Sequence, residues 1–188
     1  MNSYNLTDEF PVLTFIDFEN NDERDFYTTY AITPYDHWLT DEEMVDTIDR
    51  IVSELNKKIF GDKAQTFLTF YAELFDRFQV YEIVMENYKE QLTNNNYTVV
   101  LHIDKGIFIE RCKNSLRGNP LMRIIIPELH LLIEDLHDLT SLLHFSKSHT
   151  IENLNLIKEI FERHGLYNLK WGEKDITIEN TILNYLKK

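Results

Sequence analysis

The stretch Tyr97-Thr-Val-Val-Leu-His-Ile103, followed by Asp104-Lys-Gly106 and Ile107-Phe-Ile-Glu-Arg-Cys112, decides the fold that we expect. Both apolar runs are rich in β-branched and aromatic residues, which favour strands. Gly106 supplies a residue that tolerates a positive φ between them. The stretch therefore predicts a β-hairpin, in which the chain turns at residues 104–106 and runs back to Cys112.

Further strands are expected on the C-terminal side of this hairpin. The loop 115–120 leads into a strand over residues 121–134, Asp135-Leu-His-Asp138 reverses the chain, and residues 139–145 return. These segments predict four strands in an antiparallel meander. Residues 166–171 alternate as a fifth, short strand, so we expect a four- to five-stranded antiparallel sheet over about 97–145 plus 166–171.

Pro127 complicates one of these strands. A proline cannot donate to a ladder, so a strand through Ile124-Ile-Ile-Pro127 should lie at an edge or carry a bulge. The same region also fits a helix that begins at Pro127, with leucines at helical spacing. Those leucines are Leu129, Leu132, Leu136, Leu139 and Leu143. The Ile triplet favours the strand, and the helix over 127–145 stays open as the alternative.

Helices are expected before and after the main strand-forming region of the sequence. Thr40-Asp-Glu-Glu43 is a capping box that starts a helix over about 41–60, and Gly61 ends it. Apolar residues at spacings of three and four predict a second helix over about 63–93, which pairs with the first as a hairpin. C-terminal helices are expected at about 150–164, stopped by Gly165, and at 177–187. With a strand-like arm over 10–18, we expect one α+β domain over residues 1–188.

The charge of the chain is strongly negative and unevenly distributed. Its 19 Lys and Arg against 32 Asp and Glu give a net charge of −13. Residues 1–50 hold 13 of the acidic residues and two basic ones, a net charge of −11, which leaves −2 for the remainder. Because phosphates must be neutralised by Lys or Arg, this balance argues against nucleic acid as a ligand. It favours a basic partner.

Cysteine content and the N-terminal sequence bear on the compartment. The single cysteine, Cys112, excludes an intrachain disulfide framework and is typical of a reducing compartment. Asp8, Glu9 and Asp17 stand where a signal peptide would carry basic residues, and no apolar run reaches the length of a membrane helix. We therefore expect a cytoplasmic protein that does not contact a membrane.

The search for catalytic or metal-binding chemistry yields few candidates. His130, His137 and His144, with Glu134 and Asp138, could hold a divalent ion in either fold of this region, but their spacing lacks the zinc motif His-Glu-x-x-His. A solvated sheet face explains the same residues and is the favoured interpretation. Cys112 is expected to be buried and structural, and the acidic run from 17 to 25 lacks the glycine and glutamate of a calcium loop. No cofactor, no metal site and no enzymatic activity are expected.

A resemblance to bacterial immunity proteins rests on three segments. These are Ile126-Pro-Glu-Leu-His-Leu-Leu-Ile-Glu134, Asp138-Leu-Thr-Ser-Leu-Leu-His-Phe145 and His164-Gly-Leu-Tyr-Asn-Leu169. They resemble the sheet-and-helix portion of small immunity proteins of contact-dependent inhibition and polymorphic toxin systems. The resemblance implies a non-catalytic protein that binds and neutralises a cognate basic toxin domain, such as a nuclease. The alternatives are a cytosolic adaptor or structural protein of unknown partner, and a His/Asp metal-dependent enzyme.

The acidic quarter of the chain supplies the predicted toxin-binding residues. Carboxylates can steer a basic partner, and aromatic side chains commonly anchor interfaces. The candidate residues are Asp17, Glu19, Asp22, Glu23, Asp25, Tyr35, Asp36, Trp38, Asp41, Glu42, Asp46 and Asp49. Tyr35 and Trp38 are the expected anchors. A simpler explanation of the same acids is that they keep the protein soluble and complement a helix N-terminus.

Overall fold

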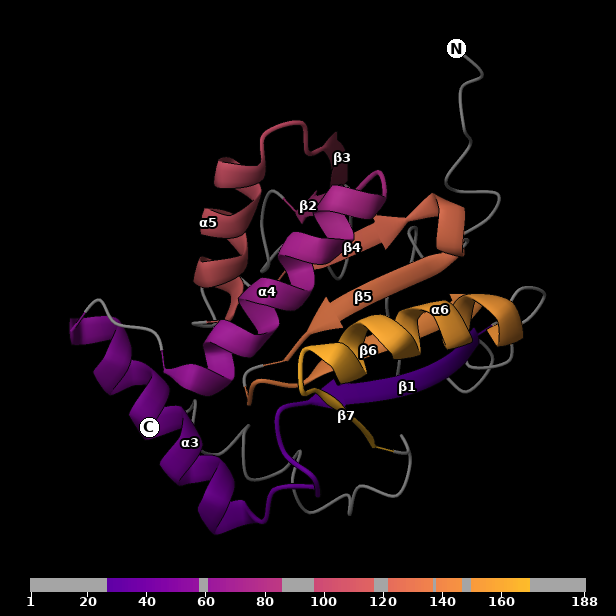
Figure 1. The fold of residues 1–188 in the computed structure, drawn as a ribbon. Coiled ribbons are helices and arrows are strands. Elements are labelled where there is room, and N and C mark those ends of the chain that lie inside the picture. Colours follow the sequence, from indigo (N-terminus) through magenta and orange to yellow (C-terminus); the bar gives the residue numbers. More distant parts are fainter. Residues whose placement is uncertain are drawn as a thin grey trace.

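A computed structural model describes residues 27–57, 61–85, 97–116, 122–136, 138–146 and 150–169 of the 188-residue chain. It has an α+β fold, as expected, with helices packed on a seven-stranded antiparallel sheet (Figure 1). The strands are β1 (Tyr27–Thr33), β2 (Tyr81–Met85), β3 (Tyr97–Leu101), β4 (Arg123–Ile126), β5 (Leu131–Asp135), β6 (Ser141–Ser146) and β7 (Tyr167–Leu169). The helices are α3 (Asp41–Lys57), α4 (Asp62–Arg77), α5 (Lys105–Leu116), the 3-10 turn η2 (Pro127–Leu129) and α6 (Thr150–Arg163).

The sheet has the strand order β3-β2-β4-β5-β6-β1-β7. Its centre is an antiparallel meander, in which β4 pairs with β5 through Ile124 and Ile133, and β5 pairs with β6 through Ile133 and Leu143. Of this meander, the sequence predicted only the reversal between β5 and β6. Strands β1 and β2 add to this centre on opposite sides. The sheet therefore has seven strands instead of four to five, and the two additional pairings join segments far apart in the sequence.

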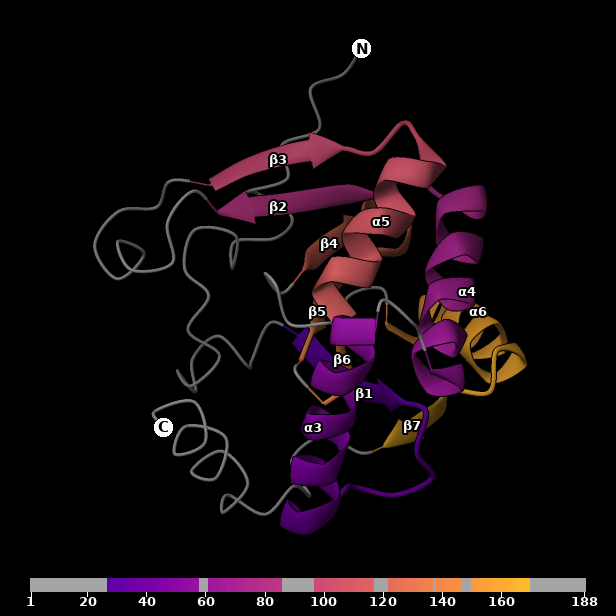
Figure 2. The ribbon, with the colours of Figure 1, turned by 90° about the vertical axis from the view of Figure 1, so that its left-hand side faces the viewer.

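Helices α4, α5 and α6 lie on one face of the sheet (Figures 1 and 2). Helix α4 crosses this face and packs against both α5 and α6. Helix α3 lies beyond one end of α4 in both views, so α3 and α4 do not form the expected side-by-side hairpin. It nevertheless reaches the core, because Met44 and Ile51 belong to the same buried cluster as the sheet and the other helices.

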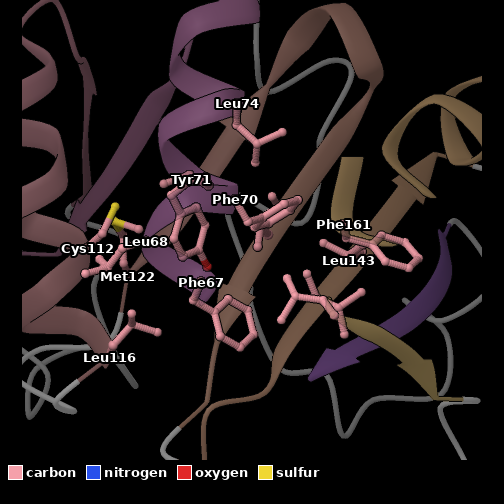
Figure 3. Close-up of a cluster of buried hydrophobic side chains, with 14 of the residues drawn as sticks. Phe67, Leu68, Phe70, Tyr71, Leu74, Cys112, Leu116, Met122, Leu143 and Phe161 are labelled. Atoms are coloured by element: carbon pink, nitrogen blue, oxygen red, sulfur yellow. The ribbon is translucent and has the colours of Figure 1, made fainter. Parts of the chain in front are cut away.

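The core is built around aromatic side chains of α4. Phe67, Phe70 and Tyr71 are fully buried and recur at helical spacing, as the sequence pattern predicts. Figure 3 shows them between side chains of α5, such as Cys112, on one side and those of β6 and α6, such as Phe161, on the other. Because α4 touches both flanking helices and the sheet, it is the central element of the helical layer.

The segment Ile107–Cys112 was predicted to be a strand, and this prediction is wrong. It lies in α5, and the expected turn before it is the N-terminus of that helix, where the Ile107 N–H donates to Asp104 Oδ1 over 2.9 Å. Phe108 and Cys112 are both fully buried and stand four residues apart, on one helical face. The β-branched composition is overridden by this cap and by packing against α4.

The predicted helix over 63–93 is also too long. Helix α4 ends at Arg77, and residues 81–85 form β2, which lies between β3 and β4. The aromatic residues Phe78 and Tyr81 continue the spacing of α4, which is why the pattern extends the helix past its end. Residues 86–93 lie outside the described part of the chain.

Pro127 lies between two strands and in neither of them. It opens the 3-10 turn η2, which ends at His130 in the left-handed conformation with φ of 47°. The turn needs no N–H from Pro127, so β4 and β5 are both interior strands without a bulge at the proline. The single strand expected over 121–134 is therefore wrong, because the chain reverses at η2 and forms two paired strands. The strand expected over 139–145 is confirmed by β6, and the helical alternative over 127–145 is wrong.

The C-terminal predictions that fall in the described residues agree with the structure. Helix α6 spans Thr150–Arg163, Gly165 follows it with φ of 73°, and the short strand β7 covers three of the six predicted residues. The expected arm over 10–18 and helix over 177–187 lie outside the described residues. Of the helices described, none combines the length and apolarity needed to span a membrane.

A buried carboxylate joins four elements in the core. Asp135, at the end of β5, accepts hydrogen bonds from the hydroxyls of Tyr71 on α4, Ser115 on α5 (2.6 Å) and Ser141 on β6 (2.7 Å). Ser115 also accepts the N–H of Met122 over 2.6 Å. Burial raises the pKa of Asp135, although the three hydroxyl donors oppose that shift. Tyr71 is buried beside it and its pKa is likewise raised.

We expect Asp135→Asn to change how stability depends on pH. Because the folded state raises the pKa of Asp135, it binds the proton more tightly than the unfolded chain does. The contribution of this group to the free energy of unfolding is therefore largest below its unfolded pKa, and it falls as pH rises through its folded pKa. Urea unfolding from about pH 4 to about pH 8 measures this for both proteins. The free energy of unfolding of the wild type minus that of the variant should decrease as pH rises. A difference that stays constant with pH would contradict the raised pKa of Asp135 in the folded state.

Candidate functional site

The acidic residues in the described part of the predicted site lie on the loop after β1 and on α3. Between positions 36 and 50 the chain carries six carboxylates and one arginine, a net charge of −5 if His37 is neutral. The acidic members are Asp36, Asp41, Glu42, Glu43, Asp46 and Asp49, and all of them are exposed. We call the exposed residues of this set, with half-buried Trp38, the acidic surface.

Helix α3 presents this surface because its two faces differ in composition. Met44, Thr47 and Ile51 are buried and face the core, while Asp46 and Asp49 stand on the exposed side. Carboxylates in the first turn also complement the positive end of the helix dipole. The acids at the start of α3 thus have a local structural role, whereas Asp46 and Asp49 lie beyond the first turn of the helix.

The predicted capping box fixes the start of α3. The Glu43 N–H donates to Thr40 Oγ1 over 3.3 Å, and Glu43 Oε2 accepts the Thr40 N–H over 2.9 Å. The Thr40 backbone N–H lowers the pKa of Glu43, and the Thr40 hydroxyl, which also donates to Glu43 Oε2 over 2.9 Å, acts in the same direction. The two reciprocal bonds satisfy donors at the helix start and hold the loop against α3.

His37 connects the loop to this cap, which the sequence analysis missed. Its Nδ1 lies 2.7 Å from Asp36 Oδ1 and its Nε2 lies 3.3 Å from Glu43 Oε1. Hydrogen bonding to Asp36 raises the pKa of His37, and the same contact lowers the pKa of Asp36. Two neighbouring carboxylates therefore favour the charged imidazolium. The signal available in the sequence was the adjacency of Asp36 and His37, next to a capping box.

Tyr35 is a core residue in this structure. It is 8% exposed, its hydroxyl lies 3.3 Å from Thr47 Oγ1, and it accepts a hydrogen bond of 3.0 Å from Arg50. Lys63 Nζ lies 3.6 Å from the centroid of its ring, in cation-π geometry. Tyr35 thus connects the loop after β1 to α3 and α4 through contacts inside the fold. Of the two predicted anchors, Trp38 is the one that reaches the surface.

Five predicted contact residues are outside the described part of the chain. They are Asp17, Glu19, Asp22, Glu23 and Asp25. Their proposed role stays a prediction from sequence. The site that the structure describes therefore consists of the acidic surface alone.

The histidine series is not gathered into one site. His130 ends the turn η2, His144 lies on β6 with its Nδ1 2.9 Å from Thr29 Oγ1, and His137 is outside the described residues. Glu134 accepts a hydrogen bond of 2.7 Å from Arg123 and has its Oε2 3.8 Å from His144 Nε2, so the structure brings these two candidates together. Asp138 is buried in the turn before β6. Among the described residues there is no cluster of three or more His, Cys, Asp or Glu side chains placed to hold a metal ion.

Cys112 is fully buried on α5, as expected of a structural cysteine, although it lies in a helix and not in a strand. Burial raises the pKa of its thiol well above the ordinary value, and the nearby carboxylate of Asp135 acts in the same direction. A nucleophilic cysteine needs an accessible thiolate. Its environment favours the neutral thiol.

We expect Thr40→Ala to destabilise the start of α3. The variant loses the hydroxyl that accepts the Glu43 N–H, and removal of such a cap typically costs about 1 kcal/mol. The free energy of unfolding from urea titration measures the loss, and Thr40→Ser is the matched control because it keeps the hydroxyl. Equal losses in the two variants would show that the hydroxyl does not act as a cap.

Comparison of the chain with known protein families, with curated proteins and with solved structures found no match.

Proposed function

We propose that this chain is a non-catalytic immunity protein that binds a basic toxin domain, of nuclease type, through the acidic surface. The observation that carries the proposal is the exposure of six carboxylates within fifteen residues of one loop and helix, against one arginine. A nuclease site is basic because it holds phosphates, so a surface of this charge competes for it. We place the protein in the cytoplasm, where such a toxin would act.

The physical advantage of such a surface is the speed of association. Clustered charge of one sign raises encounter rates with an oppositely charged partner by about 10- to 1,000-fold at low ionic strength. An inhibitor of this kind must bind its toxin quickly, and it needs no catalytic activity of its own. The carboxylates of α3 are held on a helix that is capped by Thr40 and Glu43 and packed through Met44, which keeps the surface ordered before the partner arrives.

Trp38 is the proposed aromatic contact within this surface. It is half-buried and lies between exposed His37 and buried Leu39, two residues before the cap of α3. Large aromatic residues in such positions often contribute most of the affinity in an interface. We leave Tyr35 out of the contact set because its ring and hydroxyl are already used within the fold.

An adaptor with another basic partner would use the same surface, and the identity of the bound protein separates the two functions. An immunity gene is expected next to its toxin gene. We do not carry the metal-enzyme alternative forward, because the described residues hold no group of three or more His, Cys, Asp or Glu side chains placed to bind a metal ion.

We expect the double variant Asp46→Lys and Asp49→Lys to slow association. The toxin domain is first identified by affinity capture from the source cells, with the wild-type protein as bait. The captured protein whose gene lies next to the gene of this chain is then purified. Reversal of two charges on the exposed side of α3 should lower the association rate constant at least about tenfold at low salt. Surface plasmon resonance at rising ionic strength measures the rate, and the deficit should shrink as salt screens the charges.

The matched control is Glu159→Lys with Glu162→Lys, which makes the same change of net charge on the exposed side of α6. Circular dichroism checks that both double variants are folded. If the two pairs slow association equally, only net charge matters and the acidic surface is not the interface. Failure to capture any basic protein with wild-type bait would overturn the immunity function itself.

A further inference from the structure

Strand β3 lies at one end of the sheet with its outer edge open among the described strands. The His102 N–H donates to the Val80 carbonyl over 3.0 Å, and Val100 pairs with Glu82 two residues earlier. In an antiparallel ladder the backbone groups of alternate residues point to opposite sides. The N–H and C=O groups of Val99 and Leu101 therefore point away from β2, toward the open edge.

Within the described strand and the two residues after it, this edge carries neither the charge nor the proline that normally prevents pairing. Segment 97–103 contains no Asp, Glu, Lys, Arg or Pro, although the chain carries a net charge of −13. Large apolar side chains are exposed along it and beside it, with Val100 at 40%, Leu101 at 41% and Ile103 at 86%. Proteins usually protect an open strand with charge, proline or a bulge, because it is a template for another strand.

We propose that β3 pairs in antiparallel fashion with β3 of a second copy of this chain, about a two-fold axis at Val99. A two-fold axis requires each strand to be complementary to itself. With Val99 opposite Val99 of the second copy, Leu101 lies opposite Tyr97 and Val100 opposite Thr98. All three positions then combine β-branched, aliphatic or aromatic residues, which are favourable cross-strand neighbours.

The register also satisfies the backbone. Val99 and Leu101 are the residues whose N–H and C=O groups face the open edge, so both pairings centred on Val99 are of the hydrogen-bonded kind. The pairing would extend the sheet continuously across the two copies. The paired strands contain no charged residue, so no like charges face one another, although the chain as a whole carries a net charge of −13.

The net charge gives the association a characteristic response to salt. Two copies that each carry −13 repel one another, while the paired strands are uncharged. Added salt screens the repulsion and should therefore strengthen the dimer. Binding of a basic partner to the acidic surface responds in the opposite direction, so the dimer can fail or succeed independently of the proposed function.

Light scattering coupled to size-exclusion chromatography tests the proposal. As the protein concentration rises, the average mass should increase from 22.5 kDa toward twice that value. At a fixed protein concentration, the average mass should also increase when salt is raised from about 0.05 M to about 0.5 M. The variant Val99→Pro should stay monomeric and folded, because proline at this position removes an N–H that faces the open edge and none that pairs with β2. A wild type that is monomeric throughout, or a dimer that dissociates in salt, overturns the proposal.

Cross-linking tests the register directly and does not depend on a destabilising variant. In a hydrogen-bonded pair the Cα atoms are about 5.5 Å apart, within the range of a disulfide. Val99→Cys should therefore form an intermolecular disulfide under oxidation. The control Val84→Cys, 39% exposed on β2, should not, because its two copies are about three strand spacings, or ~14 Å, apart. Native Cys112 is buried and gives little background. Equal cross-linking at both positions would place the contact elsewhere.

Discussion

The Asp135 carboxylate and the three hydroxyls that surround it fix the relative positions of the sheet and two of its helices. Tyr71, Ser115 and Ser141 come from α4, α5 and β6, and each donates to the same carboxylate. A buried carboxylate is costly unless it is fully hydrogen-bonded, so its cost falls only when all three elements are correctly placed. Apolar packing alone tolerates small displacements of a helix along a sheet. This group of polar contacts does not.

The rest of the helical layer follows from that placement. With Tyr71 directed at Asp135, the neighbouring Phe67 and Phe70 of α4 enter the core, and Phe108 of α5 meets the ring of Tyr71 edge-on at 6.4 Å between centroids. Two residues after Tyr71, Glu73 accepts a hydrogen bond from Arg163 at the end of α6 (2.8 Å) and pairs with His164, the next residue (2.7 Å). The central helix is thus held by polar contacts on two sides of an aromatic core.

The two surfaces that we assign to interactions lie at opposite ends of the described molecule. Strand β3 and helix α3 are well separated in both views (Figures 1 and 2). They also differ in chemistry, since the edge of β3 uses backbone groups and apolar side chains whereas α3 presents carboxylates. A dimer through β3 would therefore leave both acidic surfaces accessible, and would offer two of them to basic partners.

Elements with local signals could be predicted from the sequence alone. The capping box at Thr40 and Glu43, the apolar face of α6 and the glycine after it, and the exposure of Asp46 and Asp49 opposite Met44 all follow from short-range patterns, and the structure agrees with them. The placement of continuous apolar runs, in contrast, depended on long-range contacts. Ile124-Ile-Ile126 and Leu131-Leu-Ile133 are buried on both faces, so they lack the alternation that distinguishes a strand from a helix. Ile107–Cys112 became a helix because Asp104 caps it and α4 packs on it, and Tyr81–Met85 became a strand because β3 and β4 lie on either side. The burial of Tyr35 likewise depends on Lys63 and Arg50, whose proximity requires the folded chain.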